Sequence, residues 1–331
     1  MANLLKPLTK GPLQLSNRLV MPPMATEKAS SNGMVSEELL AYYNEKTRGG
    51  YIGLVIVEHS YIKPEGKVSP RQLSVDQNAT VKGLKKLAET IQANGSRAVM
   101  QINHAGSNTT EEITGTIPLA PSAVMHPKRK TVPRELNTGE IEDIIAAFGQ
   151  AALKVKNSGF DGVELHAAHG FLLSQFYSPL TNKRTDHFGG DLTNRLNIHL
   201  AIIQAIRKAV GEDYPLLLRL GAADYMDGGV TIEESVLAAH EFEKAGVDIL
   251  DISGGLSGYS IPGLTGPGFF APLTEAIKKT VSIPVILTGG VTDAEAADEL
   301  IKIDKADLIG VGRAIFKDSG WAKKAVEYLK N

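Results

Sequence analysis

Short apolar runs alternate with helical patterns along the whole of this 331-residue chain. Eight of the runs have the length of buried strands, and they cover residues 17–25, 53–58, 97–103, 160–165, 215–221, 247–252, 284–290 and 307–313. A helical pattern follows each run, with a predicted N-cap at Ser36 and predicted capping boxes at Thr231 with Glu234 and Thr292 with Glu295. Eight strand-then-helix units predict an α/β fold, a (β/α)₈ TIM barrel, formed as one domain over residues 1–331. A doubly wound sheet is the alternative, but eight regular units without a linker favour a closed barrel.

Residues 104–138 interrupt this regularity. The segment is long, rich in Pro, Thr and Lys, and without a helical period. Long loops in compact domains are commonly functional, so we expect a lid-like loop over a pocket. Within it, Lys128-Arg129-Lys130 offers positive charge to an anionic cofactor, although a solvated charged loop is the simpler explanation.

The composition limits the classes of protein to which the chain can belong. Hydrophobic residues make up 43% and charged residues 22%, as in globular proteins. The formal net charge of −2 gives no bulk attraction to nucleic acid or to an anionic membrane, so we expect neither as a partner. The absence of cysteine excludes disulfides, iron–sulfur clusters and thiolate catalysis. No apolar stretch approaches the ~18 residues of a membrane span, and the N-terminus lacks a signal-peptide pattern, so we expect a cytoplasmic protein. The oligomeric state stays open, a homo-oligomer included.

Polar residues and glycines follow the predicted strands at the ends where a TIM barrel carries its active site. In chain order they are Met24, Ala25, Glu58, His59, Gln101, His104, His166, His169, Arg219, Asp251, Gly289, Gly290, Gly312 and Arg313. His166 and His169 leave one strand end three residues apart. Two imidazoles in this arrangement can direct two N–H donors, or two metal-ligating nitrogens, at one point.

The last two strand ends are rich in glycine. Gly289-Gly290 and Gly312-Arg313 each precede a predicted helix, so their backbone N–H groups can bind a phosphate, as is common after strands seven and eight of TIM barrels. Arg313 can add a charge-assisted contact. Tight turns alone also explain each glycine.

Gln101 and Arg219 are predicted to point inward from the third and fifth strands. An amide that donates and accepts, beside a guanidinium, suits the edge of a uracil-like ring such as the pyrimidine end of a flavin. A buried guanidinium needs an anion or several carbonyl groups. A salt bridge from Arg219 to Glu164 or Asp251 fits the spacing equally well.

Several motifs also resemble those of the old yellow enzyme family. They are Asn17-Arg-Leu-Val-Met-Pro-Pro-Met24, Gln101-Ile-Asn-His104-Ala-Gly106, His166-Ala-Ala-His169-Gly170, Asn182-Lys-Arg184-Thr-Asp186-His-Phe-Gly189-Gly190, Asn194-Arg195, Arg219-Leu-Gly and Gly312-Arg313. The resemblance runs essentially end to end and implies an FMN-containing, NAD(P)H-dependent ene-reductase on a (β/α)₈ barrel. The length is similar to that of the short bacterial class. The fused dienoyl-CoA reductases carry an iron–sulfur cluster and a further flavin domain, for which this chain has neither the cysteines nor the length.

The resemblance implies a role for each matching position. The expected FMN contacts are Pro22, Pro23, Met24, Ala25, His59, Gln101, Arg219, Gly289, Gly290, Gly312 and Arg313. His166 and His169 are expected to hold the carbonyl oxygen of the substrate, so that hydride passes from the flavin to the β-carbon. NADH or NADPH would reduce the flavin again at the same face.

Four positions depart from the family pattern. Phe171 replaces the usual Tyr proton donor, and Ala25 replaces the usual Cys or Thr beside the flavin. Glu27 stands where the short class tends to have an active-site Tyr, and His59 replaces a small residue. With Phe171 and Glu27 expected at the substrate, we predict that quinones, nitro compounds or similar acceptors are preferred to enones. Water or the hydroxyl of Tyr61, Tyr225 or Tyr259 is the alternative proton source.

Two other functions fit part of the pattern. A metal-dependent barrel hydrolase would use His104, His166, His169 and a carboxylate as ligands, and would leave Gln101 and the glycine turns unexplained. A protein that binds FMN or a phosphorylated ligand without turnover would explain Phe171 and Ala25.

Overall fold

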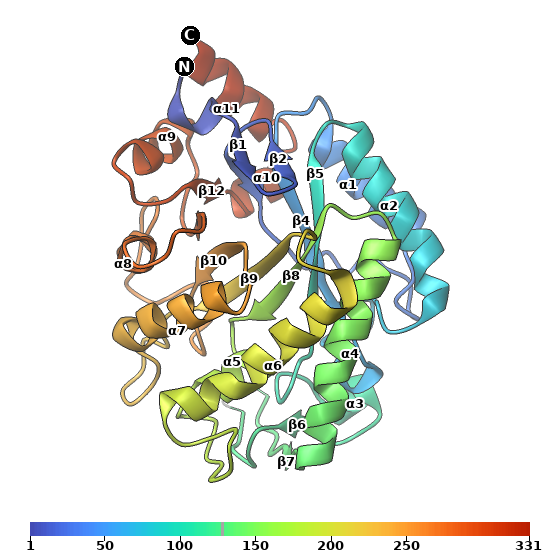
Figure 1. Ribbon diagram of the computed structural model, residues 1–331. Coiled ribbons are helices and arrows are strands. Elements are labelled where there is room, and N and C mark those ends of the chain that lie inside the picture. Colours follow the sequence, from blue (N-terminus) through green and yellow to red (C-terminus); the bar gives the residue numbers. More distant parts are fainter. Residues whose placement is uncertain (127–128) are drawn as a thin grey trace.

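The computed structural model describes residues 1–126 and 129–331, so Lys128 of the predicted basic run lies outside the described part. Eight parallel strands close into a barrel, which confirms the predicted (β/α)₈ fold (Figure 1). In the order of pairing they are β3 (Leu19–Met21), β4 (Leu54–Tyr61), β5 (Arg97–Asn103), β8 (Gly162–Ala167), β9 (Leu216–Gly221), β10 (Ile249–Ser253), β11 (Val285–Thr288) and β12 (Leu308–Gly310). Strand β12 pairs with β3 and completes the ring.

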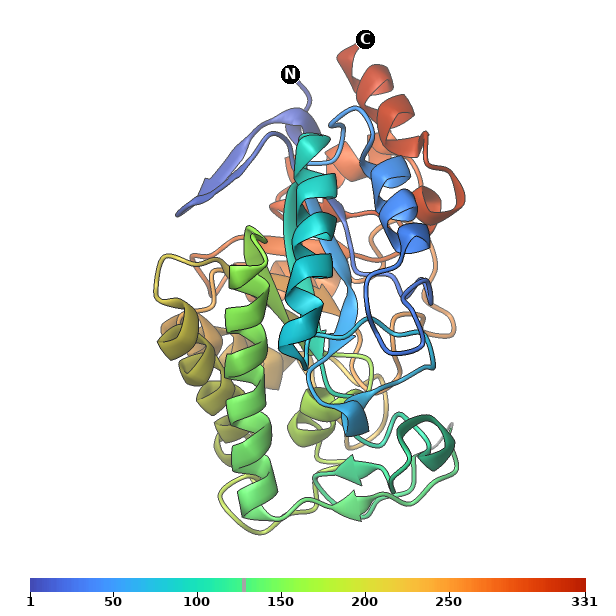
Figure 2. The ribbon, with the colours of Figure 1, turned by 90° about the vertical axis from the view of Figure 1, so that its right-hand side faces the viewer.

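Helices surround the barrel. The longer ones are α1 (Glu37–Thr47), α2 (Val81–Ala93), α4 (Thr138–Asn157), α6 (Leu192–Val210), α7 (Ile232–Lys244), α8 (Ala271–Lys278), α9 (Ala294–Lys302) and α11 (Trp321–Lys330). Helices α1, α2 and α4 lie next to one another along one side (Figure 2). Three short helices, α3 (Glu111–Thr114), α5 (Leu172–Tyr177) and α10 (Arg313–Lys317), lie in the loops that follow strands.

The predicted helix starts are right in one case, partly right in a second and wrong in the third. Ser36 caps α1, with its Oγ accepting from the backbone N–H of Leu39 at 3.0 Å. Thr231 caps α7, but the Glu234 side chain pairs with Arg195 and not with the cap. The box predicted at Thr292 is wrong. The residue that caps α9 is Asp293, the next residue, whose carboxylate accepts from Ala296 N at 2.8 Å.

An N-terminal hairpin that sequence reasoning missed closes one end of the barrel. Strands β1 (Leu8–Lys10) and β2 (Leu13–Leu15) pair antiparallel. Leu13 and Leu15 are buried in a cluster with inward side chains of seven barrel strands, among them Leu54, Leu217 and Leu308. These residues lie toward the N-terminal ends of the strands, so the hairpin covers the end opposite the predicted site.

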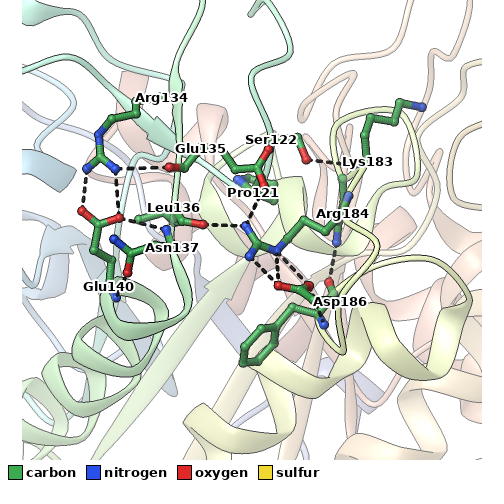
Figure 3. Close-up of polar contacts among 12 residues, drawn as sticks. Pro121, Ser122, Arg134, Glu135, Leu136, Asn137, Glu140, Lys183, Arg184 and Asp186 are labelled. Atoms are coloured by element: carbon green, nitrogen blue, oxygen red, sulfur yellow. Dashed lines mark hydrogen bonds and ion pairs between the residues drawn. The ribbon is translucent and has the colours of Figure 1, made fainter.

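The segment 104–138 has more structure than predicted. It contains α3 and two short parallel strands, β6 (Leu119–Ala120) and β7 (Arg134–Glu135). Arg184 holds both ends of this piece, because its Nη1 donates to the carbonyl oxygens of Pro121 at 3.0 Å and Leu136 at 2.6 Å (Figure 3). The buried guanidinium also pairs with Asp186 at 2.5 Å. Arg184, which belongs to the motif of residues 182–190, therefore anchors the segment 104–138 that follows β5.

Within the described residues, no helix combines the length and the apolar character needed to cross a bilayer.

Candidate active site

A cavity of about 680 Å³ opens at the C-terminal ends of the barrel strands. This volume is within the range of about 300–1,000 Å³ typical of small-molecule and cofactor sites. Of the residues predicted for the site, those that line it are Pro22, Pro23, Met24, Ala25, His59, Gln101, His166, His169, Phe171, Arg219, Gly289, Gly290, Gly312 and Arg313. Of the other residues predicted at the strand ends, Glu58, His104 and Asp251 are buried and do not line the cavity. Glu27, predicted at the substrate, does not line it either. It is exposed, in the left-handed backbone conformation at φ 55°.

The two histidines stand at the end of β8. His166 is the fifth residue of the strand and is buried, and its ring centroid lies 5.2 Å from that of His169 at an interplanar angle of 84°. His169 has φ 59° and is fixed to the end of β10: its Nε2 is 2.7 Å from Ser253 Oγ, and its backbone N–H donates to Gly254 O. Among the described residues His166 Nδ1 has no hydrogen-bond partner. The pair thus offers polar imidazole edges to one cavity.

Burial keeps the imidazoles of His166 and His59 neutral. It lowers the pKa of His166 well below 6.5, and the neighbouring His169, Arg219 and His59 lower it further. Burial also lowers the pKa of His59 to about 4. Each ring therefore carries one N–H near neutral pH and can donate a hydrogen bond without bringing a net charge.

Phe171 packs beside the histidines. Its ring centroid is 4.8 Å from that of His166 and 5.3 Å from that of His59. Of the three tyrosines considered as proton sources, only Tyr259 lines the cavity, with its ring 5.7 Å from that of His169. The aromatic side chain that packs against His166 is thus a phenyl group. Of the three tyrosines, the one at the cavity lies on the loop after β10.

Arg219 and Gln101 flank the histidine strand, because β5 and β9 are the neighbours of β8. The alternative explanation for Arg219 is also realised: its Nε lies 3.4 Å from Asp251 Oδ2. Gln101 Nε2 donates to Glu164 Oε2 at 2.7 Å. Arg219 and Gln101 nevertheless line the cavity. Each side chain therefore contacts a buried carboxyl group, Asp251 or Glu164, and also faces the space where a ligand could bind.

The glycine turns lie on the opposite side of the ring, because β12 is four strands away from β8 in the closed order. Gly290 has φ 69°, and a β-carbon there would meet Gly266 O at 2.0 Å, so the close approach of these two loops requires glycine. Gly312 is the N-cap of α10, and Arg313 begins that helix. A ligand with a ring at Gln101 and Arg219 and a phosphate at Gly290, Gly312 and Arg313 would span the cavity, and FMN has this chemistry.

Some lining residues were not predicted. They are Asn108, Ser253, Gly258, Phe269, Thr288, Val291, Thr292, Gly310 and Phe316, while Tyr259 and Arg129 were named only as alternatives. Ser253 and Thr288 are the last residues of β10 and β11, so the rule that strand ends carry the site could have predicted them. Arg129, from the predicted basic run, reaches the cavity wall and its Nε donates to Asn108 Oδ1 at 3.3 Å.

The alternative metal site does not form. His104 is buried away from the cavity, and its ring lies where a β-carbon on Gly66 would come within 2.5 Å. Its Nδ1 accepts from the backbone N–H of Gly106. Across residues 1–126 and 129–331, no three His, Cys, Asp or Glu side chains gather in a way that could hold a metal ion.

The fold and the site define a TIM-barrel protein with a nucleotide-sized cavity, two histidines on one side and a glycine-rich phosphate-type site on the other. The sequence matches the NADH:flavin oxidoreductase / NADH oxidase family over residues 3–331, and the chain belongs to this family, whose members depend on FMN. The resemblance to the old yellow enzymes is thereby confirmed.

Individual relatives differ in length and in the reactions after which they are named. The chain is 44% identical to the NADH oxidase of Thermoanaerobacter brockii over 97% of its own length and 50% of that protein. It is 36% identical to the NADPH dehydrogenase of Halalkalibacterium halodurans, with 94% of this chain and 90% of that protein covered. A solved 2-naphthoyl-CoA reductase in complex with 2-naphthoyl-CoA is 31% identical with a TM-score of 0.94, covering 98% of this chain and 52% of that one. The chain therefore spans about half the length of two of these three proteins.

Proposed function

We propose that the protein is an FMN-dependent NAD(P)H oxidoreductase of the ene-reductase type that reduces a small-molecule acceptor. The observation that carries this proposal is one cavity with His166 and His169 on one side and the Gly290, Gly312 and Arg313 turns on the other. Bound FMN would supply the two-electron chemistry, accepting a hydride from NADH or NADPH and passing it to the acceptor. Since this reaction consumes the NAD(P)H of the cell interior, we also propose a cytoplasmic location.

The chain's own residues would hold the cofactor at both ends. The Arg219 guanidinium stabilises negative charge on the reduced pyrimidine ring, and Gln101 offers an amide to its edge. Backbone N–H groups at Gly290 and Gly312, with the Arg313 side chain, bind the phosphate. Residues Pro22 to Ala25 and His59 form the wall against the ring.

His166 and His169 would bind the acceptor oxygen. Two N–H donors aimed at that oxygen withdraw electron density from a conjugated acceptor and stabilise the anion that follows reduction. Phe171 has no proton to give to a carbon atom. We therefore propose that quinones, nitro compounds or related acceptors, which need no proton placed on carbon, are reduced faster than simple enones.

The experiment is a two-step reduction of purified protein. The FMN content is measured first, and anaerobic NADH or NADPH should then bleach the flavin, with a quinone restoring its absorbance. Arg219→Ala should lower FMN occupancy. Arg97→Ala is the matched control, because Arg97 begins β5 and pairs with Asp161 but does not line the cavity. Protein that binds no FMN after reconstitution would refute the proposal. Bound FMN that neither nucleotide reduces would favour the non-catalytic binding protein instead.

A further inference from the structure

Two carboxyl groups are sealed in the barrel beneath the cavity floor. Glu164 on β8 and Asp251 on β10 are both fully buried, and the strand between them carries Arg219. Arg219 is in register with Asp251, and Gln101 is in register with Glu164. The proposed function uses Arg219 and Gln101 but assigns nothing to the acids behind them. Two acids near one guanidinium cannot both be ionised cheaply, because a buried charge without compensation costs several kcal/mol.

The contacts of the two acids are unequal. Asp251 Oδ2 lies 3.4 Å from Arg219 Nε, an ionic contact without a hydrogen bond among the described residues, and its Oδ1 accepts from Thr288 Oγ1 at 3.1 Å. Glu164 accepts one amide hydrogen bond, from Gln101, and among the described residues its Oε1 has no hydrogen-bond partner either. The direct cationic contact therefore favours the ionised form at Asp251, and the direct contact with a neutral amide favours the protonated form at Glu164.

The pKa directions agree with this division. Burial raises the pKa of Glu164 well above 4.5, the negative charge of Asp251 raises it further, and Arg219 and Gln101 oppose the shift. Burial also raises the pKa of Asp251, while Arg219 and the hydroxyl of Thr288 lower it. Since each ionised acid disfavours ionisation of the other, the pair keeps one proton, and Glu164 is the better place for it.

We propose that Asp251 is the charged member of this pair and offsets part of the charge of Arg219, while Glu164 is a neutral acid that orients Gln101. The proposal rests on the function proposed above, because it concerns the charge presented to bound FMN. With Gln101 Nε2 held by Glu164, the amide presents its carbonyl oxygen to an N–H of the ring. With Arg219 partly offset by Asp251, the site favours the reduced, anionic ring less strongly than a lone guanidinium would. Asp251 is thus a positioning residue whose charge helps to set the midpoint potential, and Glu164 is a positioning residue that orients Gln101.

The test compares two isosteric variants of the FMN-loaded protein by the midpoint potential of the flavin. Asp251→Asn removes a negative charge and should favour reduced flavin at least tenfold at a fixed solution potential, about 30 mV for a two-electron couple. Glu164→Gln keeps one acceptor and one donor, as in a neutral acid, and should leave the potential at the wild-type value. Equal shifts in both variants, or a shift in Glu164→Gln alone, would overturn the proposal.

A second measurement does not need the flavin. The infrared difference spectrum of the wild type minus Glu164→Gln at neutral pH should show the C=O stretch of a buried protonated carboxylic acid. The band of Glu58, whose pKa burial raises to about 7, cancels in that difference. A difference spectrum without the band would overturn the proposal even if Asp251→Asn failed to fold. Protein that binds no FMN would refute the proposed function, whereas a loaded protein with the wrong order of potentials would refute only the charge assignment.

Discussion

Replacement of Arg184 should release the segment 104–138. In Arg184→Met the carbonyl oxygens of Pro121 and Leu136 lose a donor at 3.0 and 2.6 Å, and Asp186 loses its partner. Hydrogen bonds to charged groups contribute about 1.5–3 kcal/mol each and do not add fully. The ion pair is only partly buried, because the Arg184 and Asp186 side chains are 6% and 33% exposed, so it contributes less than the about 3–5 kcal/mol lost when a buried pair is broken. We therefore expect the free energy of opening this segment to fall by about 3–4 kcal/mol.

Arg134 provides the matched control, because it holds the same segment from the surface. Its guanidinium pairs with the Glu140 carboxylate (Figure 3). The two side chains are 48% and 31% exposed. Exposed pairs contribute about 0–1 kcal/mol, and salt screens them. Arg134→Met should therefore have little effect, and that effect should shrink as salt is added.

Limited proteolysis within 104–138 measures the difference. When cleavage is slower than reclosing, its rate follows the population of the opened segment, so ~3 kcal/mol is a rise of roughly 10²-fold. The urea midpoint of the whole chain gives the global change in parallel. Equal cleavage rates in the two variants, or a change in Arg184→Met below tenfold, would refute the view that this guanidinium anchors the segment.

Three further outcomes test the site. His166→Ala and His169→Ala should each weaken binding of a phenolate by on the order of 1.5–3 kcal/mol, and the two losses should not add. The charge-transfer absorption of the bound phenolate measures the affinity. Unchanged affinity in both variants would remove these residues from the site. Phe171→Tyr should speed the enone half-reaction, because a correctly positioned proton donor contributes ~10²–10⁴-fold to such a step. Stopped-flow measurements should show that the rate of flavin reduction is unchanged. An enone rate that does not increase would mean that protonation does not depend on this position. Burial raises the pKa of Glu58 to about 7, so its contribution to stability is present below pH 4.5 and lost as pH rises through 7. Glu58→Gln should therefore gain on the order of 2–3 kcal/mol relative to wild type between pH 5 and pH 8, and equal urea midpoint differences at both pH values would contradict this.

The strands and the cavity were predictable because parallel strands buried on both faces are continuous apolar runs. The prediction of residues 97–103 coincides with β5, and many of the residues at the ends of barrel strands face the rim. Most of the lining residues follow from this rule alone. The prediction of His166 and His169 required only that they follow the apolar run of residues 160–165.

The remaining features depend on backbone geometry or on contacts distant in sequence. Thr292 and Asp293 are both good N-caps, and only the structure chooses between them. The strands of the N-terminal hairpin have three residues each, too few for a periodic signal. Glu27 turns outward through a positive φ. The partner of Arg219 is set by the register of β9 against β10, which no local pattern encodes.

The hairpin of β1 and β2 also has a consequence for kinetics. Because Leu13 and Leu15 fill the far end of the barrel, the cavity is entered from the rim where the histidines stand. Nucleotide and acceptor would share that entrance and could not occupy the same space together. Initial-rate plots at several fixed nucleotide concentrations should then give parallel lines. An excess of either substrate should inhibit competitively against the other, and the inhibition constant would report how much of the cavity both molecules use.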